Sequence, residues 1–124
     1  MDSGALGRNY SHGEVIIQQG EIGECMYVIQ EGAVEVIIEK DGQEVLLAVR
    51  NEGEFFGEMA IFEREVRMAT VRAVGDGRTR ILTIDKKNFL RRIHEDPSLA
   101  YRIVETMSHR IRELSEEVAR LKIE

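Results

Sequence analysis

Residues 53–73 read GEFFGEMAIFEREVRMATVRA, and they carry the clearest structural signal in the chain. Two phenylalanines precede Gly57, a short apolar run follows it, and a charged segment leads to Arg67 and a β-rich run. This order predicts a strand end, one helical turn, a loop and a second strand. A glycine before a helical turn lets backbone N–H groups face an anion, and the helix dipole favours negative charge there. An arginine returning in the next strand can bind that anion through two parallel hydrogen bonds.

Glu58 narrows the kind of ligand that this segment could bind. A single carboxylate at the same turn suits a hydroxyl donor such as a ribose better than a second phosphate. The implied ligand therefore carries one phosphate and a sugar. The alternative is purely structural: Arg67 and Glu58 form a salt bridge, and Gly57 is an ordinary turn glycine.

The residues around this segment predict an all-β half. From residue 13 to 84, short runs rich in Val and Ile alternate with glycine-containing turns, and no helix longer than the single turn after Gly57 is expected between them. Asp41-Gly42 is a favourable hairpin turn, because both residues tolerate a positive φ. Strands at this spacing indicate an antiparallel sandwich or barrel. The expected strands are Val15–Ile17, Met26–Ile29, Val34–Ile38, Val45–Val49, Ala69–Val74 and Ile81–Ile84.

The two ends of the chain have different patterns. Residues 1–12 are polar and without period, which predicts a loose N-terminal arm. Residues 85–124 predict helices: a short one after Asp85, and a long one that starts at Asp96-Pro97 and runs to about residue 122. An apolar stripe marks the long helix, and its last four members follow heptad spacing, which predicts a parallel homodimeric coiled coil. The stripe comprises Leu99, Ile103, Met107, Ile111, Leu114, Val118 and Leu121.

Composition excludes several classes of function. Asp and Glu number 23 against 17 Lys and Arg in 124 residues, which argues against nucleic-acid binding by this chain alone. No apolar run approaches the roughly 20 residues that cross a bilayer, so no membrane association is expected. The single cysteine, Cys25, indicates a reducing, cytoplasmic location. His12, His94 and His109 follow no metal-ligand spacing, and no catalytic set stands out. We therefore expect no enzyme, no metal and no cofactor.

The segment FGEMAIFEREVRMATVRA, residues 56–73, closely resembles the phosphate-binding cassette of the cyclic nucleotide-binding domain. GEVIIQQGEIGECMYVIQEGAVEV, residues 13–36, resembles the opening strands of that family, with Gly20, Gly23 and Tyr27 in the expected places. The family includes the catabolite activator protein and the cAMP-dependent kinase regulatory subunits. The resemblance implies a mainly β fold: an antiparallel β-roll, like a jelly-roll barrel, over residues 13–84, with a short cassette helix within residues 53–73 and a long C-terminal amphipathic helix.

The resemblance also implies roles for individual residues. Gly57, Met59 and Ala60 would offer backbone N–H groups to the cyclic phosphate, Glu58 would accept from the ribose 2′-hydroxyl, and Arg67 would bridge the phosphate oxygens. The purine would pack against an apolar strand residue such as Leu47. Base contacts from the long helix would fall on Leu114 and Ser115, as in the catabolite activator proteins.

Two departures from the family pattern affect the ligand. Val66 replaces the proline that many members have before the arginine, so the empty loop is expected to be less rigid. Met68 replaces the Ala, Ser or Thr that often follows, and it offers no hydroxyl for guanine. The resulting hypothesis is a sensor domain that prefers cAMP over cGMP and couples binding to the position of the long helix. The alternative is an interaction and dimerisation module that kept the roll but lost the ligand.

Overall fold

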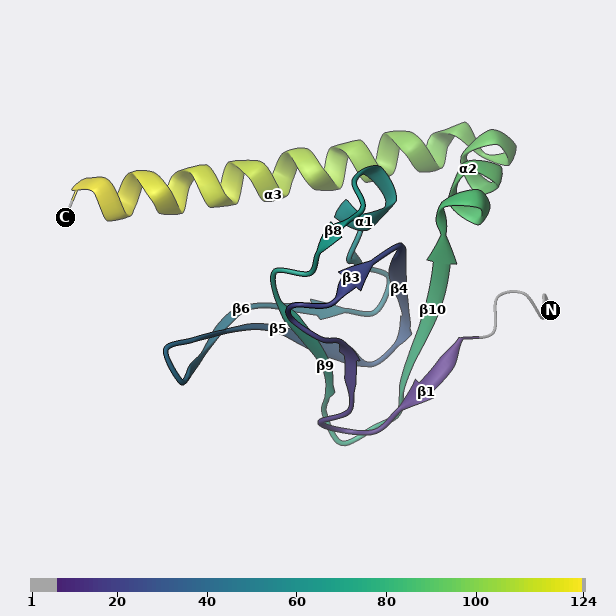
Figure 1. Cartoon of the computed structure of the whole chain (residues 1–124). Helices are drawn as coiled ribbons and strands as arrows, with labels where there is room; N and C mark the ends of the chain where they lie inside the picture. Colours follow the sequence, from purple (N-terminus) through teal and green to yellow (C-terminus); the bar gives the residue numbers. More distant parts are fainter. Residues whose placement is uncertain (1–6, 124) are drawn as a thin grey trace. The chain divides into compact units, whose positions relative to one another are not determined.

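The computed structural model describes residues 7–123, apart from the side chain of Glu65 (Figure 1). The chain divides into two compact units, residues 1–86 and residues 87–124. The first unit contains the strands and one short helix, and the second contains most of α2 and all of α3. Residues 1–6 of the expected N-terminal arm lie outside the described part of the chain.

The first unit is built from short antiparallel strands in two four-stranded sheets and one two-stranded sheet. The strand orders are β1-β10-β4-β7, β2-β9-β5-β6 and β3-β8. This arrangement confirms the expected antiparallel fold with a short helix between its strands. The elements are β1 Arg8–Tyr10, β2 Val15–Ile17, β3 Ile22–Gly23, β4 Cys25–Glu31, β5 Ala33–Lys40, β6 Gln43–Asn51, β7 Phe55–Phe56, α1 Met59–Phe62, β8 Glu65–Val66, β9 Thr70–Val74 and β10 Thr79–Asp85.

The core of this unit lies between the two larger sheets. Ile29 on β4 and Ile81 on β10 are 1% exposed, and Val34 on β5 is fully buried. Burying an aliphatic side chain of this size contributes about 1.5–3 kcal/mol, so these strands hold each other in place. The buried cluster consists of Tyr10, Ile17, Ile29, Val34, Phe56, Val71, Ala73 and Ile81.

The β5–β6 hairpin turns as the sequence predicts. Asp41 and Gly42 both have positive φ, 53° and 78°, which matches the twist of the flanking strands. The pairing is irregular between Val36 and Ile37 of β5, so that Leu47 has no direct partner there. β6 comes last in the order of its sheet, and Leu46 and Leu47 are more than half exposed.

The prediction of a loose arm is wrong for residues 8–10. They form β1, in which Arg8 pairs with Ile81 and Tyr10 with Thr79 of β10. Tyr10 is only 9% exposed and belongs to the core cluster. A strand of three residues is too short to show a period in the sequence. Its position depends on pairing with β10, the last strand of this unit.

The second unit is helical. α2 spans Lys86–Glu95, and α3 spans Pro97–Ile123 over 27 residues. The backbone N–H of Ser98 donates to the Asp96 carboxylate at 3.2 Å, and the N–H of Leu99 donates to the backbone carbonyl of Asp96 at 3.0 Å. Asp96 therefore caps α3 in the manner that the sequence predicts.

Candidate functional site

Gly57 lies between β7 and α1 and adopts a conformation that favours glycine. Its φ is +73°, in the left-handed region. A Cβ atom there would lie 3.0 Å from Nη1 of Arg67 and 3.1 Å from Cδ1 of Ile17. The positive φ thus favours glycine at the start of this turn, and close packing leaves little room for a side chain.

The backbone of Arg67 is attached to the loop before β3. Arg67 follows β8, whose Val66 pairs with Ile22 of β3. Its N–H donates to the carbonyl of Glu21 at 2.7 Å, and its carbonyl accepts from the N–H of Gly20 at 2.9 Å. These bonds hold the segment after β8 to the segment before β3, although proline is absent at position 66.

The guanidinium of Arg67 is fixed beside the Gly57 turn. Nη1 donates to the carbonyl of Gly57 at 3.0 Å, and Nη2 donates to the carbonyl of Cys25 at 2.6 Å. Its Cζ lies 5.8 Å from the centre of the Tyr27 ring, which stacks on Phe56 with 5.2 Å between the ring centres. Since a guanidinium has five N–H donors, two carbonyl bonds leave it able to bind an anion as well.

The other predicted cassette residues lie on the same turn or, in the case of Met68, directly after Arg67. Glu58 is the N-cap residue of α1, and it is 9% exposed. Ala60 is buried, whereas Met59 is 49% exposed and Met68 is 73% exposed. The N–H of Ala60 donates to the Gly57 carbonyl over 3.4 Å, a long hydrogen bond. The structure therefore brings Gly57, its α1 neighbours and Arg67 together, as the sequence predicts.

The residues predicted to contact the base lie on other elements than the Gly57 turn. Leu47 lies on β6 at the irregular point of the hairpin and is 54% exposed. Leu114 and Ser115 lie on α3, which belongs to the second unit. Their contact with the base stays a prediction.

Two titratable groups beside Arg67 have shifted pKa values. Burial raises the pKa of Tyr27, and the charge of Arg67 partly offsets that effect. Burial also raises the pKa of the Cys25 thiol; Asp85 raises it further, and Arg67 acts in the opposite direction. A raised thiol pKa keeps Cys25 protonated at neutral pH, so it is a poor nucleophile.

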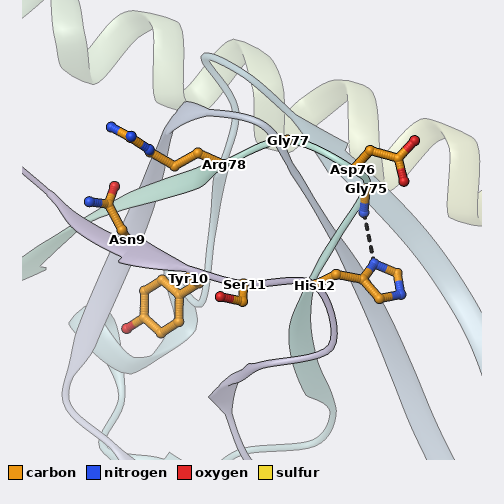
Figure 2. A pocket seen from close by; sticks show the side chains of 8 residues that line it. All are labelled: Asn9, Tyr10, Ser11, His12, Gly75, Asp76, Gly77 and Arg78. Atoms are coloured by element: carbon orange, nitrogen blue, oxygen red, sulfur yellow. Dashed lines mark hydrogen bonds between the residues drawn. The ribbon is translucent and has the colours of Figure 1, made fainter.

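A separate hollow of about 390 Å³ lies near β1 and the β9–β10 turn (Figure 2). Nδ1 of His12 accepts a hydrogen bond from the N–H of Gly75 at 3.0 Å on its rim. Its lining includes none of the predicted ligand-binding residues, so it is distinct from the Gly57 turn. The lining residues are Asn9, Tyr10, Ser11, His12, Gly75, Asp76, Gly77 and Arg78.

The described residues contain neither a metal-binding cluster nor a membrane-spanning helix. Over residues 7–123, no three side chains among His, Cys, Asp and Glu are grouped so that they could hold a metal ion. No helix in that range is both long enough and apolar enough to cross a membrane.

Three residues that surround the arginine had no individual role predicted from the sequence. Gly23 and Tyr27 lie against the guanidinium, and Cys25 offers it a carbonyl oxygen. Gly23 and Tyr27 were visible as part of the family resemblance. A backbone carbonyl has no signature in the sequence, so the contribution of Cys25 had none.

Comparisons with known proteins identify the family and the fold of this chain. The family model described as "Cyclic nucleotide-binding domain" matches residues 7–96. A cAMP-dependent protein kinase regulatory subunit of Mycosarcoma maydis is 40% identical over 68% of this chain and 17% of its own length. A cyclic AMP receptor protein of Thermus thermophilus is 32% identical over 94% of this chain and 54% of its own length. This chain thus spans about half, or less, of the length of these curated relatives.

Solved structures show the same fold. The crystal structure of Thermus thermophilus catabolite activator protein matches 93% of this chain and 54% of its own chain, with a TM-score of 0.81 and 32% identity. A cAMP-bound form of the EAL enzyme Bd1971 matches 91% of this chain and 30% of its own, with a TM-score of 0.64 and 28% identity. The mainly β fold with a C-terminal helix is thereby confirmed.

Proposed function

Because this chain belongs to the cyclic nucleotide-binding domain family, we propose that it is a regulatory sensor module that binds cAMP in preference to cGMP. Binding takes place at residues 57–68, without a chemical reaction. The relatives named above include proteins described as cAMP-dependent or as cyclic AMP receptors.

The position of the Arg67 guanidinium is the observation that carries this proposal. Hydrogen bonds to the carbonyls of Gly57 and Cys25 hold it at the turn that opens α1. A fixed, planar cation of this kind suits a phosphate diester better than a mobile lysine would, because little side-chain freedom remains to be lost on binding. The charge of one guanidinium matches the single negative charge of a cyclic phosphate.

The neighbouring residues take the roles that the family resemblance implies. Backbone N–H groups of Gly57, Met59 and Ala60 contact the phosphate, and Glu58 accepts from the ribose 2′-hydroxyl. Glu58 is suited to this role because leaving a mostly buried carboxylate without a hydrogen-bond donor is costly, so the site favours a ligand that carries a hydroxyl there. Met68 offers no hydroxyl to a guanine, which favours adenine.

Calorimetric titration of the purified chain with cAMP, cGMP and 5′-AMP tests the proposal. We expect saturable binding of both cyclic nucleotides, with cAMP tighter, and much weaker binding of 5′-AMP, which has an open phosphate. No heat from either cyclic nucleotide, with a chain whose circular dichroism shows it folded, would overturn the proposal and favour the interaction module without ligand.

We propose further that the chain forms a homodimer through α3 and that nucleotide binding is coupled to the position of this helix. The support is the exposure of its apolar stripe: Ile111, Leu114 and Leu121 are each more than 60% exposed in the single chain. A row of exposed apolar residues at heptad spacing is typical of a coiled-coil seam. A ligand can shift the equilibrium between two positions of α3 only if it binds the chain with a different affinity in each position.

A further inference from the structure

We propose that Gly23 is the residue that positions Arg67, by leaving empty the space that the guanidinium occupies. A Cβ atom at Gly23 would lie 2.0 Å from Nε, 2.3 Å from Cζ and 2.6 Å from Nη2 of Arg67. All three distances are far below van der Waals contact. The arginine in its present position and a side chain at position 23 therefore exclude each other. The consequence for nucleotide binding rests on the function proposed above.

The backbone at Gly23 can accept an ordinary residue. Gly23 is not among the glycines with positive φ in the described part of the chain. It lies on β3 and pairs with Glu65 of β8. The three atoms nearest to an added Cβ all belong to the flexible side chain of Arg67. Alanine at this position would thus displace the arginine side chain and leave the strand as it is.

Two other closely packed glycines, Gly57 and Gly32, do not separate displacement of a side chain from disturbance of the backbone. At Gly57, a side chain would be strained by the positive φ and would also meet Ile17. At Gly32, φ is also positive, and a Cβ would lie 2.7 Å from the carbonyl oxygen of Arg78. Substitution at either position disturbs the backbone, whereas substitution at Gly23 acts on the arginine.

Displacement would break the contacts that define the site. The guanidinium would leave the carbonyls of Gly57 and Cys25, because Nε, Cζ and Nη2 form the part that meets the new methyl group. An arginine without a fixed position binds a phosphate less well, since its side-chain entropy is then lost on binding. Gly23 makes no contact with nucleotide in this scheme and acts through Arg67.

The test compares Gly23→Ala with Gly77→Ala. Gly77 is a matched control, because a Cβ there meets nothing within 4 Å and its φ is not positive. By calorimetry, we expect Gly23→Ala to weaken cAMP binding about 10- to 150-fold, the range for loss of a charge-assisted hydrogen bond. Gly77→Ala should change the affinity less than about twofold. An unchanged affinity in Gly23→Ala overturns the proposal.

A double-mutant cycle distinguishes positioning from a general structural effect. In the Arg67→Ala background, Gly23→Ala should add less than about a twofold loss of affinity, because its target is already absent. A further loss as large as in the unmodified chain would show that Gly23 acts by another route. If Gly23→Ala lowers the melting temperature, Arg67→Ala should restore it by removing the clash; failure to restore it contradicts the proposal.

A readout without nucleotide keeps this inference separate from the proposed function. The side-chain Nε–Hε resonance of Arg67, identified by its loss in Arg67→Ala, reports the position of the guanidinium beside the Tyr27 ring. We expect it to shift in Gly23→Ala and not in Gly77→Ala. A shift in a chain that binds no nucleotide would support the positioning and overturn only the proposed function. An unshifted resonance overturns the positioning.

Discussion

Arg67 is bound on several sides by groups from distant parts of the chain. Its side chain contacts the carbonyls of Gly57 and Cys25, and its backbone is bonded to Gly20 and Glu21. Charge-assisted hydrogen bonds of this kind contribute about 1.5–3 kcal/mol each when the alternative is an unpaired group. The residue therefore has both a structural role and the ligand role that we propose, and substitution can separate the two.

Arg67→Ala is expected to weaken cAMP binding by roughly 10- to 150-fold or more, because the charge and its hydrogen bonds are lost together. The cAMP affinity of Arg67→Lys should lie between that of the unmodified chain and that of Arg67→Ala, since lysine keeps the charge but lacks the planar pair of donors. Titration calorimetry measures both variants. Unchanged affinity in Arg67→Ala would remove the phosphate assignment, and loss of the β-sheet signal in circular dichroism would favour a purely structural role.

Selectivity between the two cyclic nucleotides is expected to depend on Met68. Its side chain is 73% exposed and offers no hydrogen-bond donor to guanine. The unmodified chain should bind cAMP more tightly than cGMP by about 1 kcal/mol or more, and Met68→Thr should narrow that difference. Parallel titrations with both ligands provide the measurement. A preference for cGMP in the unmodified chain would mean that another residue recognises the base.

Secondary structure was predicted best from the sequence where local chemistry alone determines it. The Asp41-Gly42 turn and the Asp96-Pro97 helix start follow from φ preferences and capping, and both are present. The strands β1, β3 and β8 have two or three residues each, and none was predicted, whereas β7 coincides with the strand end predicted before Gly57. Such strands exist through pairing with distant partners, as Ile22 does with Val66, so local pattern cannot reveal them.

The same distinction applies to the site. The turn residues and Arg67 could be predicted because they form one continuous motif. The placement of Arg67 against Gly23 of β3 and Cys25 of β4 could not, because it depends on the pairing of β3 with β8, which lies far along the chain.

The long helix carries its own prediction. Leu114→Glu places a charge in the exposed apolar row of α3, where Leu114 is 65% exposed. We expect the variant to be a monomer and to bind cAMP more weakly, because a buried, unpaired carboxylate is strongly unfavourable in a coiled-coil seam. Sedimentation and calorimetry on this one variant test both steps. A persistent dimer contradicts the proposed seam, and a monomer with normal affinity contradicts the coupling.

We expect the two units to respond to nucleotide together. If binding is coupled to the position of α3, cAMP should change amide hydrogen exchange along residues 105–121 as well as at residues 57–68. Mass spectrometry of exchange with and without cAMP measures both segments in one sample. The Arg67→Ala variant at the same cAMP concentration serves as the control. Protection confined to residues 57–68 would show that the units act independently.

The position of β6 at the end of its sheet order has a consequence for the behaviour of the chain at high concentration. Val45, Leu46, Leu47 and Val49 are each 45–58% exposed along this strand. An edge strand with apolar side chains is a template for strand addition from another molecule, the first step of amyloid-like aggregation. The irregular pairing at Leu47 interrupts that template, and Glu44 and Arg50 place charges on either side of it. We therefore expect the tendency of this chain to form fibrils to depend on this local interruption more than on its net charge of −6.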